Sequence, residues 1–384
     1  MTPGFVKRLH ILLLLLALAP IVRGEEPKIA AALQPYVDRH AVAGAVTLVA
    51  DKDRVLSVDT VGYSDLAAKT LMGPDALFWI ASQSKPITAA ALMMLVDEGE
   101  VQLDDPIEKH LPEFRGLWLA TEQDKDHILL KHPRRLVTVR DVLRHTSGMA
   151  FRSALETPTL DGLSLRDAVR SYAMTPLTYE PGTKYVYSNA GINTAGRIIE
   201  VVSGMPYEDF MQKRLFDPLG MKDTTFWPTP AQVKRLAKGY KPNAAKDDLE
   251  ETTVAQLTYP LSDRRRGPMP AGGYFATADD CGRFCRMLLR GGELDGKRVL
   301  SENAVKEMTK RQTPQELPTS YGLGLSVGPT SFGHGGAWAT NMSVDTKRGL
   351  VEIYLIQHAG FAKDGAQAQG AFRKAAEERF AAAK

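Results

Sequence analysis

The chain has 384 residues, 44% of them hydrophobic and 24% charged, which is typical of a folded globular protein with one large or two smaller domains. Its formal net charge of +3 equals the basic surplus of the first 24 positions, which hold Lys7, Arg8 and Arg23 and no acidic residue. The chain shows no basic patch interleaved with aromatic residues, so we expect no nucleic-acid partner.

The N-terminus has the parts of a secretory signal peptide. Lys7 and Arg8 give a basic start, an apolar run covers 11–22, and Gly24 with Val22 provides a cleavage site. The apolar run is too short for a comfortable transmembrane helix. We therefore expect residues 1–24 to be a signal peptide, the mature protein to be exported to the periplasm or beyond, and no stable membrane insertion. An uncleaved anchor is the alternative.

In chain order, the pattern is rich in strands, then in helices, then in strands again. The first part predicts a helix and two strands at 27–39, 42–50 and 54–61. The middle predicts helices at 138–145, 164–173, 190–202 and 208–216, then loops with an arginine run at 222–268. The last part predicts a helix at 277–289, strands at 322–327, 331–333, 339–345 and 350–358, and a closing helix at 366–383.

This order predicts an α/β fold of the α+β type, with an antiparallel sheet built from both chain ends, flanking helices and a helical insert. We expect one unit over 25–384, whose α/β part is 25–100 and 270–384 and whose helical part is 101–269. The two cysteines, Cys281 and Cys285, are four apart on a predicted helix, where a disulfide would be strained. The histidines are scattered, so we expect no metal and no cofactor.

Ser82 and Lys85 stand three positions apart, where the apolar pair Phe78-Trp79 runs into a helix expected to end near Gly99. On a helix they share one face, and the free N–H groups of its N-terminus favour developing negative charge. A serine hydroxyl needs a base to become a nucleophile, and a buried lysine can be that base. A serine and a lysine three positions apart also occur by chance, so a catalytic role for Ser82 requires partner residues elsewhere in the chain.

Two further short runs offer such partners. Tyr187-Ser188-Asn189 lies just before a predicted helix, where a phenolate stabilised by an ammonium could act as a base. An asparagine can donate to and accept from a carbonyl-containing substrate. His334-Gly335-Gly336 precedes a late strand, and glycines there would let a ligand lie against the strand edge. Taken alone, either run also fits a structural loop.

Together, Ser82-x-x-Lys85, Tyr187-Ser188-Asn189 and His334-Gly335-Gly336 resemble, in order and spacing, the three motifs of the β-lactamase-like serine hydrolases. That family includes class C β-lactamases, D-alanyl-D-alanine carboxypeptidases and related esterases. Five more runs agree with the resemblance, at 143–149, 180–182, 218–221, 271–274 and 321–324. The resemblance spans the mature chain and implies the β-lactamase/transpeptidase-like fold.

The resemblance also implies a catalytic role for each matching residue. Ser82 would be the nucleophile, and Lys85 and Tyr187 would take its proton and return it to the leaving group. The backbone N–H groups of Ser82 and Ala337 would form the oxyanion hole. There is no separate glutamate motif, so deacylation would depend on Tyr187 and Lys85.

Substrate contacts would come from Asn189, His334, Gly335 and Gly336. His334 stands where many members have lysine, so its charge is not permanent. His145, in the run His145-Thr146-Ser147-Gly148, is expected to be structural. Esters, β-lactams and peptidoglycan-derived D-peptides are all substrates of relatives. The run 78–86 looks most like the esterase-type members, so we favour an ester or another small-molecule substrate.

Two alternatives stay open. One is a penicillin-binding or peptidoglycan-sensing protein of the same fold that is acylated once and does not turn over. The other is an α/β-hydrolase that uses Ser326, because Gly324 to Gly328 match G-x-S-x-G and Asp345 and His358 follow in triad order. That motif needs a helix directly after the serine, whereas a strand-like run follows here.

Overall fold

The structure is a computed structural model that describes residues 29–380, together with Met1. The predicted signal peptide, apart from Met1, therefore lies outside the described residues. Among the residues that are described, none of the helices combines the length and apolarity needed to cross a bilayer.

A seven-stranded antiparallel sheet forms the centre of the fold. Its strand order is β12 (Ser326–Val327), β13 (Ser331–Gly335), β14 (Asn341–Asp345), β15 (Leu350–Leu355), β1 (Gly44–Ala50), β2 (Val55–Asp65) and β3 (Thr70–Leu71). β1 and β15 pair at the middle, with Val46 opposite Leu355. This arrangement confirms the predicted sheet built from both chain ends.

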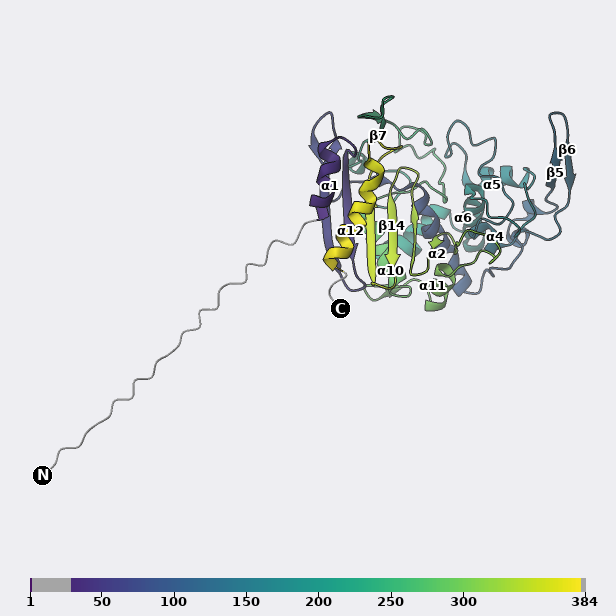
Figure 1. Cartoon of the computed structure of the whole chain (residues 1–384). Helices are drawn as coiled ribbons and strands as arrows, with labels where there is room; N and C mark the ends of the chain where they lie inside the picture. Colours follow the sequence, from purple (N-terminus) through teal and green to yellow (C-terminus); the bar gives the residue numbers. More distant parts are fainter. Residues whose placement is uncertain (2–28, 381–384) are drawn as a thin grey trace.

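Helices cover both faces of this sheet (Figure 1). Along β1, Val46 and Leu48 pack into the core on the side of α10 (Ala278–Leu289), whereas Ala45 and Val49 pack with α1 (Ile29–Asp38) and α12 (Ala368–Phe380). Successive side chains of a strand point to opposite faces. Because both faces are covered, β1 and β15 are buried along their whole length.

The helical part of the chain lies beyond one edge of the sheet, with the β5–β6 hairpin projecting from it (Figure 1). Its elements are α3 (Ile107–His110), η2 (Pro112–Phe114), β5 (Leu119–Gln123), β6 (Ile128–Lys131), α4 (Val139–Leu143), α5 (Leu165–Ala173), α6 (Asn189–Ser203), α7 (Tyr207–Met211), η3 (Gln212–Phe216) and α8 (Asp217–Leu219). Helix α2 (Ser84–Asp97), from the preceding part of the chain, packs against it. Helix α6 packs against α2, α4 and α5, and so connects the segment that carries Lys85 with the rest of the helical part. The division of the chain at 101 and 270 stays a prediction.

The remaining elements are short. They are α9 (Pro230–Val233), β7 (Gly239–Pro242), β8 (Leu249–Thr252), β10 (Glu293–Leu294), β11 (Lys297–Arg298), α11 (Glu302–Thr309) and η4 (Gly365–Gln367). The hairpin of β7 and β8 falls inside the region 222–268, which was predicted to be rich in loops. The predicted strand at 322–327 is mostly wrong: Gly324 has a φ of +74°, and the Gly322 N–H donates to the Leu325 carbonyl at 2.9 Å. This turn leaves only Ser326–Val327 in the sheet.

A run of charged residues is usually solvated, but in the arginine run at 264–266 only Arg264 and Arg265 are exposed. The Arg266 side chain is buried and its Nε donates to Asp161 Oδ2 at 2.8 Å. Arg264 stacks over the Trp227 ring, 4.7 Å from its centroid, and Arg265 pairs with Asp263 at the surface. A buried charge needs such a partner, and the partner here is about a hundred residues away in sequence.

Candidate active site

Ser82 lies at the junction of a short strand pair and a buried helix. β4 (Phe78–Trp79) pairs with β9 (Phe275–Ala276), and the turn η1 (Ala81–Gln83) follows before α2 begins at Ser84. Ser82 was expected in the first turn of the helix, but it lies in this preceding 3₁₀ turn. Between Ala76 and Leu95 every residue is buried except Ser82. The hydroxyl is thus the one polar group that this segment presents to the outside.

The residue before Ser82 has an unusual backbone. Ala81 has a φ of +46°, in the left-handed region that costs a residue with a Cβ of the order of 1–2 kcal/mol. Such strain persists only where the surroundings fix the conformation, and it clusters at functional sites. We interpret the turn at Ala81 as the device that directs Ser82 out of the buried run.

The Lys85 ammonium nitrogen lies in a fully buried polar pocket. Nζ is 2.6 Å from the Ala271 carbonyl oxygen, 2.8 Å from Asn189 Oδ1 and 3.1 Å from Ser82 Oγ. Burial lowers the pKa of Lys85 well below its usual value. Both nearer oxygens belong to carbonyl groups, which can only accept a hydrogen bond. A neutral amine therefore donates its two protons to them and points its lone pair at the Ser82 hydroxyl.

Both carbonyl groups are fixed by helix α6. Asn189 is its first residue, and the Ser188 side chain caps it by accepting from the Gly191 N–H at 3.2 Å. One turn later, Asn193 Oδ1 accepts from the Ala271 N–H at 2.9 Å. The start of α6 therefore positions both acceptors of Lys85. The Asn189 oxygen is occupied by Lys85, and its contact with substrate stays a proposal.

Tyr187 lies over Lys85, but in a different way from the ammonium–phenolate pair that we expected. Nζ sits 4.7 Å from the centroid of the phenol ring, and Lys85 donates no hydrogen bond to the phenol oxygen within the described part of the chain. Burial raises the pKa of Tyr187, and the Ser82 side chain beside it opposes that rise in part. Tyr187 is accordingly a neutral phenol next to Ser82.

The end of β13 approaches the Ser82 turn very closely. A Cβ on Gly336 would lie 2.6 Å from the Ile80 carbonyl oxygen and 2.1 Å from Thr340 Oγ1, so only glycine fits there. Gly335 and Ala337 on either side are exposed. The backbone at 335–337 therefore forms an open edge beside Ser82, where a substrate carbonyl could reach the N–H of Ala337.

His334 is turned inward from this edge. Its Nε2 lies 3.0 Å from the Tyr321 hydroxyl and its Nδ1 lies 2.6 Å from the Gly335 carbonyl oxygen. Burial, with the Lys85 charge as a smaller cause, lowers the pKa of His334 to about 3. His145 contacts the same Tyr321 hydroxyl at 3.2 Å. Its full burial agrees with the structural role predicted for it.

The structure brings Ser82, Lys85, Tyr187 and Asn189 together, and their catalytic roles stay a prediction. Three residues to which the sequence pattern assigned no role also line this site. These are Ala271, Asn193 and Tyr321. Ala271 and Tyr321 open two of the runs that supported the family resemblance. That resemblance was the only available signal, because these contacts join segments far apart in sequence.

Ser326 does not form the elbow of an α/β-hydrolase, so that alternative is wrong. It lies on the edge strand β12, opposite Gly333, and a turn into β13 follows it. The elbow needs a serine between a strand and a helix. The two residues that followed it in triad order have other partners: Asp345 accepts from Arg348, and His358 accepts from the Ala43 N–H at 3.1 Å.

Cys281 and Cys285 are both free and buried. Across the described residues no group of three or more histidine, cysteine, aspartate or glutamate side chains could hold a metal ion. The groups gathered at Ser82 are its own hydroxyl, the desolvated amine of Lys85 and the phenol of Tyr187.

Comparison with known proteins shows what the chain as a whole is similar to. The family model described as Beta-lactamase matches residues 29–377. Protein Rv1367c of Mycobacterium tuberculosis is 33% identical over 362 residues, covering 85% of this chain and 89% of that protein. Esterase EstB of Burkholderia gladioli is 31% identical over 263 residues, covering 62% of this chain and 64% of the esterase.

Among solved structures, unliganded simvastatin synthase (LovD) from Aspergillus terreus has a TM-score of 0.75 at 20% identity, covering 92% of this chain and 98% of that one. This likeness supports the fold. It confirms the mixed α/β architecture expected from the sequence.

Proposed function

Since the chain belongs to the beta-lactamase family, whose relatives include esterases, we propose that it is a serine hydrolase that forms an acyl-enzyme through Ser82. The observation that carries the proposal is the environment of Lys85. Two carbonyl acceptors occupy the protons of its neutral form, and the remaining lone pair faces the Ser82 hydroxyl. Burial lowers the pKa of Lys85, and a neutral amine in this position can act as a general base.

In the first half-reaction, Lys85 takes the Ser82 proton while Oγ attacks the substrate carbonyl carbon. The oxyanion lies between the N–H groups of Ser82 and Ala337, at the open edge beside Gly336. Tyr187, as a neutral phenol, passes its proton to the leaving group and remains as a phenolate, while the Lys85 ammonium keeps the proton taken from Ser82. In the second half-reaction, water loses one proton to the Tyr187 phenolate while its oxygen bonds to the acyl carbon. Ser82 Oγ then leaves with the proton held by Lys85, which releases the acid and restores all three groups.

For the substrate we propose a carboxylic ester. EstB, which carries the name of an esterase, is 31% identical over an alignment of 263 residues, and the run 78–86 looks most like the esterase-type members of the family. The alcohol of an ester is a better leaving group than the amine of an amide. The single proton of the Tyr187 phenol is enough to protonate it as it leaves. A β-lactam or a D-peptide is the competing substrate class, and a protein that is acylated without turnover is the competing function.

The test is an activity screen of the purified protein with p-nitrophenyl esters, nitrocefin and a D-alanyl-D-alanine peptide. We expect ester turnover, together with fluorophosphonate labelling that Ser82→Ala abolishes. Ser326→Ala, a second serine on the sheet edge, is the matched control and should label normally. Labelling of the Ser82→Ala protein would refute the proposal. Stoichiometric labelling of Ser82 without turnover of any substrate would favour the sensing function.

A further inference from the structure

A buried chain of hydrogen bonds runs behind the catalytic residues and joins two histidines. The Ser188 N–H donates to His145 Nδ1 at 3.2 Å, and His145 Nε2 lies 3.2 Å from the Tyr321 hydroxyl. The same hydroxyl lies 3.0 Å from His334 Nε2, and His334 Nδ1 lies 2.6 Å from the Gly335 carbonyl oxygen. His145, Tyr321 and His334 are 0%, 1% and 8% exposed.

The two ends of this chain decide where every proton lies. A backbone N–H can only donate, so His145 Nδ1 accepts and the ring carries its proton on Nε2. A carbonyl can only accept, so His334 carries its proton on Nδ1 and its Nε2 accepts. Tyr321 fits between them because a hydroxyl accepts from His145 and donates to His334 at once. Both rings are then neutral, in opposite tautomers.

Protonation of His334 would break this pattern. A second N–H would point at the Tyr321 oxygen, and the displaced hydroxyl proton would have no acceptor in a buried site. The ionisable groups that face the two rings are Lys85, Tyr187, Tyr185 and Tyr321, and no carboxylate contacts either ring among the described residues. Burial also lowers the pKa of His145 well below its usual value and raises that of Tyr321.

From this geometry we propose that Tyr321 is a positioning residue that holds His334 neutral, so that the edge at 334–336 accepts acyl donors without a carboxylate. The inference rests on the proposed ester hydrolysis and specifies its substrate class. A substrate carboxylate at this edge would lose its hydration, and neutral His334 would offer it no positive charge in return. The cation on the flanking helix, Arg373, already contacts Asn341 Oδ1 at 3.1 Å and Glu352 at 3.7 Å.

The first experiment observes the tautomers directly, without any need for activity. Long-range proton–nitrogen NMR spectra of protein labelled with ¹⁵N-histidine distinguish the two tautomers and the cation. We expect one Nδ1–H ring and one Nε2–H ring that stay neutral between pH 5.5 and 8.5, assigned through His145→Gln and His334→Gln. A His334 ring that becomes a cation in this range would overturn the inference, even if ester turnover stands.

Tyr321→Phe then tests the hydroxyl. It keeps the aromatic ring, and we expect the signals of both histidines to shift together because each loses its partner. Tyr185→Phe is the matched control, since Tyr185 packs 5.6 Å from Tyr321 and 5.8 Å from His145 between ring centroids but makes no hydrogen bond to either histidine. If Tyr185→Phe produced the same shifts, or Tyr321→Phe produced none, the positioning role would be refuted. Should Tyr321→Phe fail to fold, the wild-type spectrum alone decides.

The second experiment compares two p-nitrophenyl esters of equal length, the valerate and the glutarate monoester. An unpaired buried charge is unfavourable, so we expect the wild-type kcat/KM to favour the neutral ester by about tenfold or more, with no change in the ratio from pH 5.5 to 8.5. In Tyr321→Phe the ratio should fall severalfold at the acid end. Equal turnover of both esters by the wild type would refute the substrate class, whereas no turnover of either would refute the proposed function and leave the NMR result standing.

Discussion

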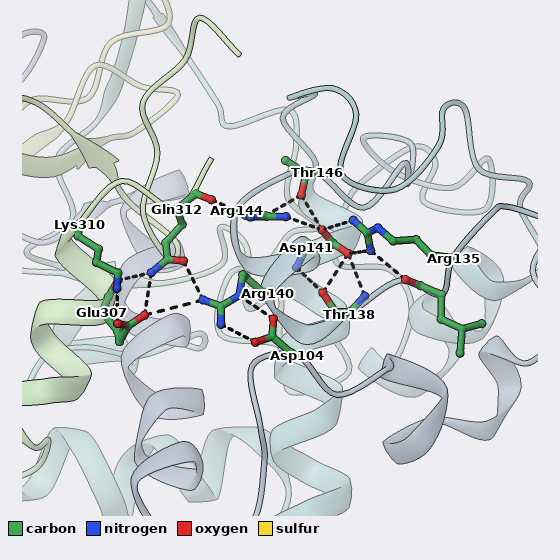
Figure 2. Close-up of polar contacts among 11 residues, drawn as sticks. Asp104, Arg135, Thr138, Arg140, Asp141, Arg144, Thr146, Glu307, Lys310 and Gln312 are labelled. Atoms are coloured by element: carbon green, nitrogen blue, oxygen red, sulfur yellow. Dashed lines mark hydrogen bonds and ion pairs between the residues drawn. The ribbon is translucent and has the colours of Figure 1, made fainter. Parts of the chain in front are cut away.

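Asp141 offers a sharp test of how the site is held in place, because its buried carboxylate organises the loop that carries His145. Figure 2 shows this carboxylate surrounded by donors from Arg135, Thr138, Arg144 and Thr146. The side chain is 0% exposed and lies within 2.6–3.1 Å of each of these partners. Asp141→Asn keeps the shape, removes the charge and turns one acceptor into a donor that faces other donors.

The expected loss of folding stability in Asp141→Asn follows from the burial of the carboxylate. Removing one partner of a buried ion pair costs about 3–5 kcal/mol. The Arg135 side chain is 42% exposed and therefore partly screened by water, so we place the loss near the lower value, about 3 kcal/mol. With an unfolding entropy of about 2 cal/mol/K per residue, a chain of 384 residues should lose roughly 4 °C in Tm.

Asp104 provides a matched control in the same network. It binds Arg140 through two contacts of 2.8 Å, but its side chain is 74% exposed (Figure 2). Exposed pairs contribute about 0–1 kcal/mol, so Asp104→Asn should shift Tm by about 1 °C or less. Calorimetry at pH 7 and moderate salt measures both variants. Equal shifts in the two variants, or an unchanged Tm for Asp141→Asn, would refute the reasoning.

The pH dependence of this effect has a definite sign. Burial alone would raise the pKa of Asp141, but the hydrogen bonds from Arg135, Thr138 and Thr146 outweigh it and lower the pKa below its usual 3.8. A lowered carboxyl pKa stabilises the folded state above the unfolded value, and that contribution is lost as the pH falls through the folded pKa. The stability advantage over Asp141→Asn should thus be constant from neutral pH to about pH 4 and shrink below it.

Three further predictions concern catalysis and export. Tyr187→Phe should lower kcat on an ester by about 10²- to 10⁴-fold in a folded protein. The double variant with Lys85→Ala should lose little more activity, because the effects of residues that act as one unit are not additive. Near-normal turnover of Tyr187→Phe, or fully additive losses in the double variant, would contradict this prediction. Burial lowers the pKa of Lys85, and the neutral amine is the active form, so kcat/KM should fall as the pH drops through that pKa. Above that pKa the profile should reach its plateau at a pH well below 10.5. A profile that still rises at about pH 10 would indicate a lysine with an ordinary pKa. Sequencing of the mature N-terminus should find it near Glu25 in a soluble fraction, and Met1 retained in membranes would point to an anchor.

The parts of the site that were predictable are those set by local sequence. The spacing of Ser82 and Lys85 required only one helix start, and the apolar residues behind them indicated burial. The run Tyr187-Ser188-Asn189 was likewise predicted to lie just before a helix, and α6 begins within it, at Asn189. The alternation of strands and helices was enough to predict a sheet built from both ends of the chain.

The parts that were not predictable depend on contacts between distant segments. No local pattern links Lys85 to the Ala271 carbonyl, which lies 186 positions further along the chain. Arg266 illustrates the same limit, since a run of three arginines is ordinarily solvated and only its distant partner Asp161 allows one of them to be buried. The exact start of α2 was missed because the 3₁₀ turn at Ala81 depends on neighbours such as Gly336.

The pairing of β1 with β15 also has a consequence for synthesis. Ala50 pairs with Val351, so about 300 further residues must be translated after β1 before its partner strand has been synthesised. At roughly 5–20 residues per second that interval is about 15–60 s, during which the apolar β1 has only β2 beside it. An unpaired apolar strand is a template for aggregation, so the nascent chain needs protection for this whole time. A chain that stops before Leu350 should never acquire its central ladder, and a translation pause late in the message would be more harmful than one early on.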